Sequence, residues 1–224
     1  MLDAKREADM SEKNTTDSYR VLLSGGEGEI VEKKSRFIAT IRSCETEEEA
    51  VSFIEEMKKK YWDARHNCSA FVIGSRGELT RCSDDGEPSG TAGRPMLEVL
   101  TGSGIRNIAV VVTRYFGGTL LGTGGLVRAY SQAVKEGLEH CETGIMRNGC
   151  ELEITTDYND VGKLQYYFGQ QGIVPTDSAY AENVKFILRI PVENEENLRK
   201  NLTELTCGKV KIEKLGELYF IDKE

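Results

Sequence analysis

The spacing of apolar and polar residues predicts two strands and a helix near the start of the chain. Residues 19–25 have a β-like pattern, apolar and polar positions alternate in residues 29–42, and the GGEG segment between them is typical of a turn. We therefore expect these two runs to form an opening hairpin. Thr46 and Glu49 have the spacing of a capping box before an amphipathic run, which predicts a helix ending near residue 60.

The middle of the chain alternates between strand and helix patterns. Residues 68–74 and 78–84 flank a three-residue turn and predict a second hairpin. Pro95 suits the first turn of a short helix in residues 95–102. Residues 108–112 form an unbroken apolar run, which is typical of a buried central strand. Apolar residues then recur at helical spacing over residues 123–140, which predicts a long amphipathic helix.

The pattern breaks at residues 143–149, and a complete new cycle of elements begins after it. The remaining segments follow the order strand, helix, strand, strand, helix, strand, which is the arrangement of ferredoxin-like domains. The polar, aperiodic start of the chain is typical of a mobile tail. We therefore predict an α+β protein with a disordered tail in residues 1–18, an N-terminal domain in residues 19–147 and a ferredoxin-like βαββαβ domain in residues 148–224.

Composition restricts the class of protein and the kind of partner. The 224 residues include 29 basic and 37 acidic side chains, and the net charge of −8 disfavours a protein that coats nucleic acid by long-range attraction. A local basic face is compatible with this charge. The chain has no export signal and no apolar run of membrane-spanning length, and its six cysteines lack C-x-x-C spacing. We expect a cytoplasmic protein with reduced thiols.

Glycine is concentrated in the part of the chain where a ligand site would be built. Twelve of the 23 glycines lie between Gly74 and Gly125, and residues 117–125 join the predicted central strand to the long helix. Glycines before a helix N-terminus favour an anion there. However, Thr123 stands where a Walker lysine would be, and Val127 where a dinucleotide motif has its third glycine. The same glycines would also let strand and helix pack closely.

Two further groups of residues have the chemistry of a site. Oxygen ligands for a divalent metal, or an acid and a base, are offered by Asp84, Asp85 and Glu87. Their spacing is not that of a calcium loop, and acidic residues beside glycine also suit an exposed turn. His66 and Cys68 lie on one face of a predicted strand and could form a zinc or nucleophile site with Cys82, but a third partner at ligand spacing is missing.

Arginines beside aromatic residues suggest contact with phosphate and with bases. Arg94 follows a glycine-rich loop, Arg114 directly precedes Tyr115 and Phe116, and Arg128 lies on the polar face of the long helix. Guanidinium groups bind phosphate, and an exposed ring can stack on a base. Tyr115 and Phe116 alternate across the strand end, so we expect one ring to pack inward. The alternative is that the arginines are ordinary surface residues paired with Asp84, Asp85 or Glu87.

Four segments resemble the YigZ/IMPACT family. The matching segments are KKSRFIA (residues 33–39), ARHNCSAFVIG (64–74), DDGEPSGTAGRPML (84–97) and VVTRYFGGTLLGTGGLVRAYSQA (111–133). The resemblance implies a ribosomal-protein-like βαβ fold for the N-terminal domain. It also implies a C-terminal domain similar to the last domain of elongation factor G. No catalytic residue set comes with this resemblance.

The resemblance also implies a connection with translation. Eukaryotic members regulate translation by binding an activator of the kinase that phosphorylates initiation factor 2, and the two-domain form of this chain resembles bacterial members, which lack that partner. We therefore expect a protein that binds RNA or a translation component, such as the ribosome or an associated protein, without catalysis and without a cofactor. The alternative is an enzyme or binder of a nucleotide or phosphorylated metabolite that uses the glycine-rich residues 117–125.

The sequence thus nominates one set of candidate ligand- or RNA-binding residues. They are Arg65, His66, Arg94, Arg114, Tyr115, Phe116, Gly117, Gly118 and Arg128.

Overall fold

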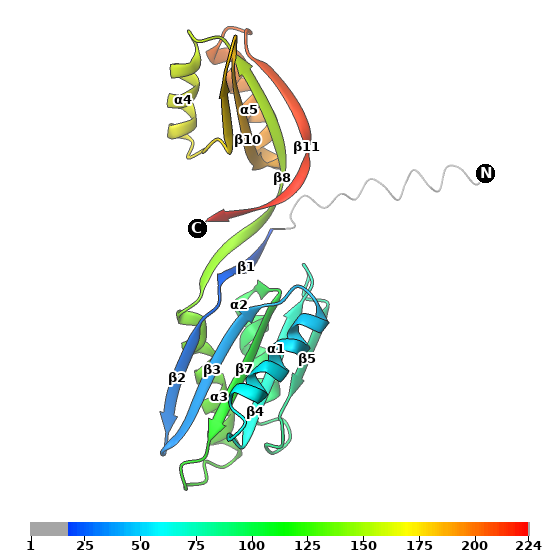
Figure 1. Cartoon of the computed structure of the whole chain (residues 1–224), viewed down its shortest axis with the longest axis vertical. Coiled ribbons are helices and arrows are strands. Elements are labelled where there is room, and N and C mark those ends of the chain that lie inside the picture. Colours follow the sequence, from blue (N-terminus) through cyan, green and yellow to red (C-terminus); the bar gives the residue numbers. More distant parts are fainter. Residues whose placement is uncertain (1–17, 224) are drawn as a thin grey trace, which may run out of the picture. The chain divides into compact units, whose positions relative to one another are not determined.

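The computed structural model describes residues 18–223 in two compact units, Tyr19–Ile145 and Met146–Ile221. Figure 1 shows the helices and strands of each unit. The predicted tail in residues 1–18 lies, except for Ser18, outside the described residues.

The first unit is built on a five-stranded sheet with the order β2-β3-β7-β4-β5. The strands are β2 (Glu27–Glu32), β3 (Ser35–Ser43), β4 (His66–Ile73), β5 (Leu79–Ser83) and β7 (Ile108–Tyr115). All four neighbouring pairs are antiparallel. β7 occupies the centre and is buried over almost its whole length, which confirms the predicted central strand.

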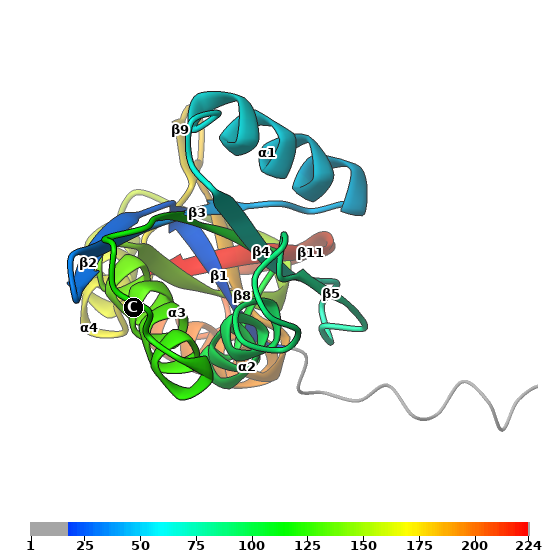
Figure 2. The same ribbon diagram turned by 90° about the horizontal axis from the view of Figure 1, so that it is seen from below.

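Helices cover both faces of this sheet, as Figure 2 shows. α1 (Glu47–Lys60) packs on one face, while α2 (Gly93–Ser103) and α3 (Thr123–Glu139) pack on the other. The chain passes from β3 through α1 to β4, and β7 lies between these two strands. This is a split βαβ unit, as the ribosomal-protein-like fold requires.

The predicted capping box at the start of α1 is present. The Thr46 hydroxyl accepts a hydrogen bond from the backbone N–H of Glu49 at 3.2 Å. The Glu49 carboxylate accepts in return from the backbone N–H of Glu45 at 2.7 Å, one residue earlier than the usual partner. Two N–H groups at the helix start are thereby satisfied.

The predicted opening hairpin is wrong in its pairing. β1 (Tyr19–Ser24) does not pair with β2 but runs parallel to the short strand β6 (Ile105–Arg106). The hairpin is instead formed by β2 and β3, inside the run that the sequence predicted as one strand. Its turn consists of Lys33 and Lys34, which have φ values of 46° and 68°. A two-residue turn preserves the alternation of apolar and polar positions, so the pattern did not reveal it.

The core of the first unit follows from strand alternation. Alternate strand residues, such as Phe37, Cys68 and Val112, face α2 and α3 and surround the fully buried Tyr130. The rings of Phe37 and Tyr130 meet edge to face with centroids 5.1 Å apart. The intervening residues face α1, where Phe53 is buried. Burial of each such large side chain contributes about 1.5–3 kcal/mol to folding.

The second unit has the predicted order of elements. They are β8 (Glu142–Thr156, of which the part from Met146 belongs to this unit), α4 (Val161–Gln170), β9 (Asp177–Tyr180), β10 (Val184–Pro191), the short 3-10 helix η1 (Val192–Asn194), α5 (Glu195–Leu205) and β11 (Lys211–Lys223). The strands are ordered β11-β8-β10-β9, with β8–β10 and β10–β9 antiparallel. This order confirms the ferredoxin-like βαββαβ fold.

One face of the second sheet carries the core and the other carries ion pairs. Leu152 of β8 and Leu188 of β10 are fully buried within the apolar core of this unit. Because alternate strand residues face opposite sides, Glu151 of β8 lies on the other face. There it pairs with Arg189 at 3.0 Å. The charges of these two residues therefore neutralise each other on this face.

Candidate functional site

Strand alternation brings polar side chains together at one end of the first sheet. At this end β3 and β4 begin, with Ser35 and His66, and β7 ends. Arg114 of β7 is paired in register with Phe37 on one side and with His66 on the other. Residues opposite each other in neighbouring strands point to the same face, so Arg114 and His66 lie on the face covered by α2 and α3.

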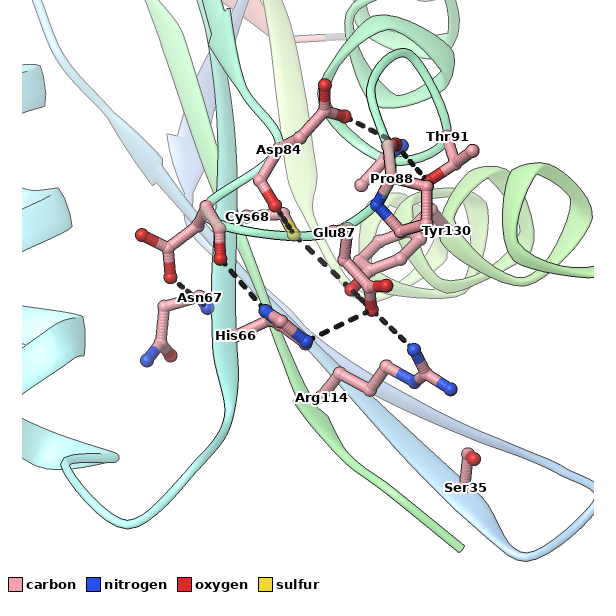
Figure 3. Close-up of polar contacts among 12 residues, drawn as sticks. Ser35, His66, Asn67, Cys68, Asp84, Glu87, Pro88, Thr91, Arg114 and Tyr130 are labelled. Carbon is pink, nitrogen blue, oxygen red and sulfur yellow. Dashed lines mark hydrogen bonds and ion pairs between the residues drawn. The ribbon is translucent and has the colours of Figure 1, made fainter. Parts of the chain in front are cut away.

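Glu87 enters this end of the sheet from the loop between β5 and α2 (Figure 3). Nη1 of Arg114 donates to Glu87 Oε1 at 2.5 Å, and the Tyr130 hydroxyl donates to the same oxygen at 2.8 Å. His66 Nε2 lies 4.0 Å from this oxygen. The side chains of Glu87 and Arg114 are 3% and 7% exposed, so this is a buried ion pair. Arg114 thus has one of the acidic partners that the alternative interpretation named, but it is buried and is not a surface arginine.

The loop that carries Glu87 is held by side-chain contacts to its backbone. Asp84 accepts hydrogen bonds from the backbone N–H groups of Gly90, Ala92 and Gly93 at 2.8–2.9 Å. Burial works to raise the pKa of the Asp84 carboxyl, but these three N–H donors outweigh burial and hold the pKa below its ordinary value. Asp85 accepts from the backbone N–H of Asn67 at 2.7 Å.

These contacts do not support the metal site predicted from the acidic residues. Asp84 and Asp85 bind backbone N–H groups, whereas Glu87 binds Arg114 and Tyr130. Within residues 18–223, no three His, Cys, Asp or Glu side chains converge as metal ligands. The three carboxylates instead position the loop between β5 and α2.

The structure also does not support the hypothesis of a zinc site or a reactive thiol at Cys68. The Cys68 thiol is fully buried and donates to the backbone oxygen of Asp84 at 3.0 Å, within 3.3 Å of the Tyr130 hydroxyl. Burial raises the pKa of this thiol to about 12, which suppresses the thiolate. Cys82 lies opposite Ala70 and is exposed, and all six cysteines are free.

Phe116 is the exposed aromatic residue at this end of the sheet. It follows β7 directly, and 41% of it remains accessible. The guanidinium carbons of Arg65 and Arg114 lie 5.8 and 5.7 Å from the centroid of its ring. The turn residues Lys33 and Lys34 belong to the same end of the sheet. We call Lys33, Lys34, Arg65 and Phe116 the Phe116 patch.

Tyr115 lies on the opposite face of the sheet from Arg114. Its hydroxyl donates to Asp63 at 2.8 Å, and the guanidinium of Arg36 lies 5.8 Å from the centroid of its ring. Tyr115 is therefore half-buried and bonded within the protein, while Phe116 presents its ring to solvent. One of the two rings is thus packed within the protein and the other is exposed, as the alternation of side chains along a strand predicts.

The remaining candidate arginines lie on the two helices of the other layer. Arg94, on α2, is exposed and pairs with Glu98 one turn later at 3.2 Å. Arg128, on α3, is exposed and lines a groove of about 440 Å³ beside β2, together with Gln132 and Lys135. Neither arginine contacts the ring of Phe116, so the three arginines Arg94, Arg114 and Arg128 do not form one cluster.

The glycines of residues 117–125 serve different purposes. A Cβ on Gly117 would lie 2.1 Å from the backbone carbon of Lys34, so this glycine permits close packing. Gly118 and Gly122 have positive φ values of 85° and 72°. Gly122 is the N-cap of α3 and provides no side-chain cap, and Gly124, the second residue of the helix, has open space around it. Close packing therefore explains Gly117 but not Gly124.

Sequence reasoning missed four residues at this end of the sheet: Ser35, Tyr130, Lys33 and Lys34. Ser35 is fully buried and accepts from the backbone N–H of Gly117 at 3.1 Å. Tyr130 looked like an apolar residue of an amphipathic helix, although a buried tyrosine normally needs a hydrogen-bond partner. The Lys33–Lys34 turn does not interrupt the alternation of apolar and polar positions, so the sequence pattern does not reveal it.

Comparison with known proteins identifies the family. The Impact N-terminal domain model matches residues 33–138, and a domain of unknown function, DUF1949, matches residues 154–209. The IMPACT family member YvyE of Bacillus subtilis is 44% identical over 209 residues, which cover 92% of this chain and 94% of YvyE. YigZ of Escherichia coli is 36% identical over 182 residues, which cover 80% of this chain and 89% of YigZ.

A solved structure agrees with this relationship. The crystal structure of a hypothetical protein has a TM-score of 0.58 and 32% sequence identity, and the match covers 90% of this chain and 98% of that one. The two units thus define a two-domain α+β protein with an Impact N-terminal domain followed by a DUF1949 domain. The chain belongs to the IMPACT family.

None of the helices in the described part of the chain combines the length and the apolar character that a membrane span requires.

Proposed function

We propose that this IMPACT family protein binds RNA without catalysis, through the Phe116 patch of its first unit. The observation that carries the proposal is the exposed ring of Phe116 beside the guanidinium groups of Arg65 and Arg114. Such a ring can stack on an unpaired base, and neighbouring cations can contact the phosphates on either side of it. A role in translation is the biological setting that the family relationship supports.

Charge at the patch favours a nucleic acid over a neutral ligand. Lys33, Lys34 and Arg65 form no ion pair with any described residue, whereas Arg36, Arg94 and Arg189 are each neutralised by a glutamate. The net charge of −8 opposes attraction over long distances, so we expect moderate affinity and strong dependence on salt. In the second unit, Lys185 and Arg189 of the open sheet face are each paired with a glutamate.

The experiment is a titration of fluorescent single-stranded RNA with the full chain at several salt concentrations. Phe116→Ala should weaken binding by about 1–3 kcal/mol because the stacking platform is lost. Arg65→Ala should weaken binding to all sequences and reduce the salt slope by about one.

Two matched variants serve as controls. Tyr166→Ala removes an exposed aromatic residue from α4 of the second unit, and Arg76→Ala removes an exposed arginine beyond the opposite end of β4. Both should bind RNA as the wild type does. Equal affinity for all five folded proteins would contradict the proposal, and would direct the search toward a protein of the translation apparatus.

A nucleotide or phosphorylated metabolite is the second candidate ligand. The observation that favours it is the start of α3, where Gly122 provides no capping side chain and Gly124 has open space. The backbone N–H groups of a first helical turn attract phosphate. Native mass spectrometry of the purified chain distinguishes the two candidates, since a bound nucleotide would support this one.

A further inference from the structure

The guanidinium group of Arg114 uses only one of its two edges within the protein. Nη1 donates to Glu87 Oε1 at 2.5 Å. Nε is buried and makes no hydrogen bond with any described residue, and none is made by Nη2. Because 94% of the Arg114 surface is buried, this edge has lost most of its contact with solvent. A buried charged donor without a partner destabilises the folded protein and is rare in native structures. A ligand that accepts hydrogen bonds at this edge would remove that cost.

The unused edge of the Arg114 guanidinium, formed by Nε and Nη2, is the edge with which arginines bind two oxygens of one anion. Nε–H and one N–H of Nη2 point in the same direction, and the pair matches the spacing of two carboxylate or phosphate oxygens. Arg36 of the same protein shows this geometry, since its Nε and Nη2 donate to the two oxygens of Glu29 at 2.8 and 2.9 Å. In Arg114 the same two donors, Nε and Nη2, are unused, while Nη1 binds Glu87.

The surroundings fix this edge in place. The Arg114 guanidinium carbon lies 5.4 Å from the ring centroid of the buried Phe37 and 5.7 Å from that of the exposed Phe116. Glu87 holds the opposite nitrogen, and Figure 3 shows Ser35 on the side of Arg114 that is remote from Glu87. Two aromatic contacts and one ion pair thus orient the group before any ligand arrives, which lowers the entropic cost of binding.

Charge selects a phosphate over a carboxylate. The two guanidinium groups of Arg65 and Arg114 lie near the same ring, and Glu87 neutralises one of them. A terminal phosphate carries between one and two negative charges and several acceptor oxygens at neutral pH. Its higher charge and its additional acceptor oxygens suit this cationic neighbourhood better than a carboxylate with a single charge does.

We propose that the Nε–Nη2 edge of Arg114 is the receptor for a terminal phosphate, with the base or sugar of the same nucleotide against Phe116. A phosphate end can reach a mostly buried donor pair more easily than a phosphodiester within a strand, which has substituents on two sides. This inference deepens the proposed RNA binding, on which it rests for the identity of the larger ligand. The phosphate site itself is tested independently of RNA.

The first experiment follows the arginine Nε–H signals of the full chain by ¹⁵N NMR during titration with inorganic phosphate. The Arg114 signal, assigned by its loss in Arg114→Lys, should move and saturate. The Nε–H signal of Arg76 should move only as much as it does with sodium chloride of equal ionic strength. The titration itself uses the wild type, and only the assignment of the Arg114 signal uses the Arg114→Lys variant. An Arg114 signal that responds equally to phosphate and chloride would overturn the proposal.

The second experiment compares one short RNA with a 5′-phosphate or a 5′-hydroxyl end, and the same RNA with a 3′-phosphate. The wild type should prefer one phosphorylated end by about 10-fold or more, as expected for a charge-assisted pair of hydrogen bonds. Arg114→Lys keeps a charge beside Glu87 but lacks the paired donors, so it should lose this preference while Arg76→Lys retains it. Circular dichroism confirms that both variants are folded.

The outcomes separate the two proposals. Saturable phosphate binding without RNA affinity would contradict the proposed function and leave the phosphate site intact. RNA binding with no preference for a phosphorylated end and no phosphate response at Arg114 would overturn the inference and leave RNA binding through Phe116 intact. Equal preference for phosphorylated ends in the wild type and in folded Arg114→Lys would also overturn it.

Discussion

Gly28 of β2 and Gly137 of α3 lie in direct backbone contact, although 109 positions separate them in the chain. A Cβ added to Gly28 would stand 2.5 Å from the backbone nitrogen of Gly137. A Cβ on Gly137 would in turn meet the side chain of Ile41 at 2.9 Å. The two glycines therefore let the edge strand of the sheet approach the long helix more closely than any side chain would permit.

Gly28→Ala should lower the free energy of unfolding by about 1–3 kcal/mol, because the new methyl group has no room between β2 and α3. Gly124→Ala is the matched control at the start of α3, where a Cβ would meet nothing within 4 Å. It should raise the free energy of unfolding by about 0.4–1 kcal/mol through the unfolded state. Urea unfolding and amide exchange in β7 measure both effects. A Gly28→Ala protein as stable as the wild type would contradict the close contact.

Glu87→Gln should lower the free energy of unfolding by about 3–5 kcal/mol, because it leaves the buried Arg114 charge without its counter-charge. Glu98→Gln removes an equivalent partner from Arg94, but that pair is 78% and 67% exposed. Its cost should be below about 1 kcal/mol. Urea unfolding followed by circular dichroism compares the two variants. Similar losses for both would show that the Glu87–Arg114 pair is not a buried interaction.

The contribution of Asp84 to stability should depend on pH. The pKa of its carboxyl lies below the ordinary value of 3.8 in the folded protein, so the charged form stabilises the fold. This contribution is fully present above the ordinary pKa and is lost as pH falls through the folded-state pKa. Asp84→Asn should therefore be less stable than the wild type by about 1–3 kcal/mol at neutral pH, with a smaller difference below about pH 4. Urea unfolding across this range measures it, and a difference that grows on acidification would have the wrong sign.

The segment from Met146 to the C-terminus should fold by itself, because its apolar residues form a core of their own around Leu152 and Leu188. The fragment should give dispersed amide NMR signals and unfold cooperatively in urea. Leu188→Ala should lower its free energy of unfolding by about 2–5 kcal/mol. Collapsed amide signals would place the domain boundary elsewhere.

Much of the fold could be predicted from the chain alone because local pattern and local structure agree. The Thr46–Glu49 cap is a contact between residues three apart, so its spacing reveals it directly. The buried β7 follows from its unbroken apolar run, and the ferredoxin-like unit follows from the order of its elements. Each of these features is encoded within a few neighbouring positions.

Less of the candidate site could be predicted from local sequence pattern. Arg114 resembles a surface arginine in the sequence, since Glu87 could be named as a partner but nothing indicates that this pair is buried or that Tyr130 joins it. Asp84 and Asp85 resemble metal ligands because their use of backbone N–H groups depends on how the loop folds. The partners of Arg114 and Asp85 come from other parts of the fold, and those of Asp84 lie six to nine positions further along the chain.

The sequence by itself therefore determined the periodic elements, their order and the separation of Tyr115 from Phe116, since these depend on alternation along one strand. Only the tertiary structure decided which neighbours each polar side chain meets. It paired Arg114 with Glu87, left the Nε–Nη2 edge of Arg114 without a partner among the described residues, and brought Arg65 to the ring of Phe116. The physical reason is that strand register and loop closure join residues far apart in the chain, and no local pattern records which residues will meet.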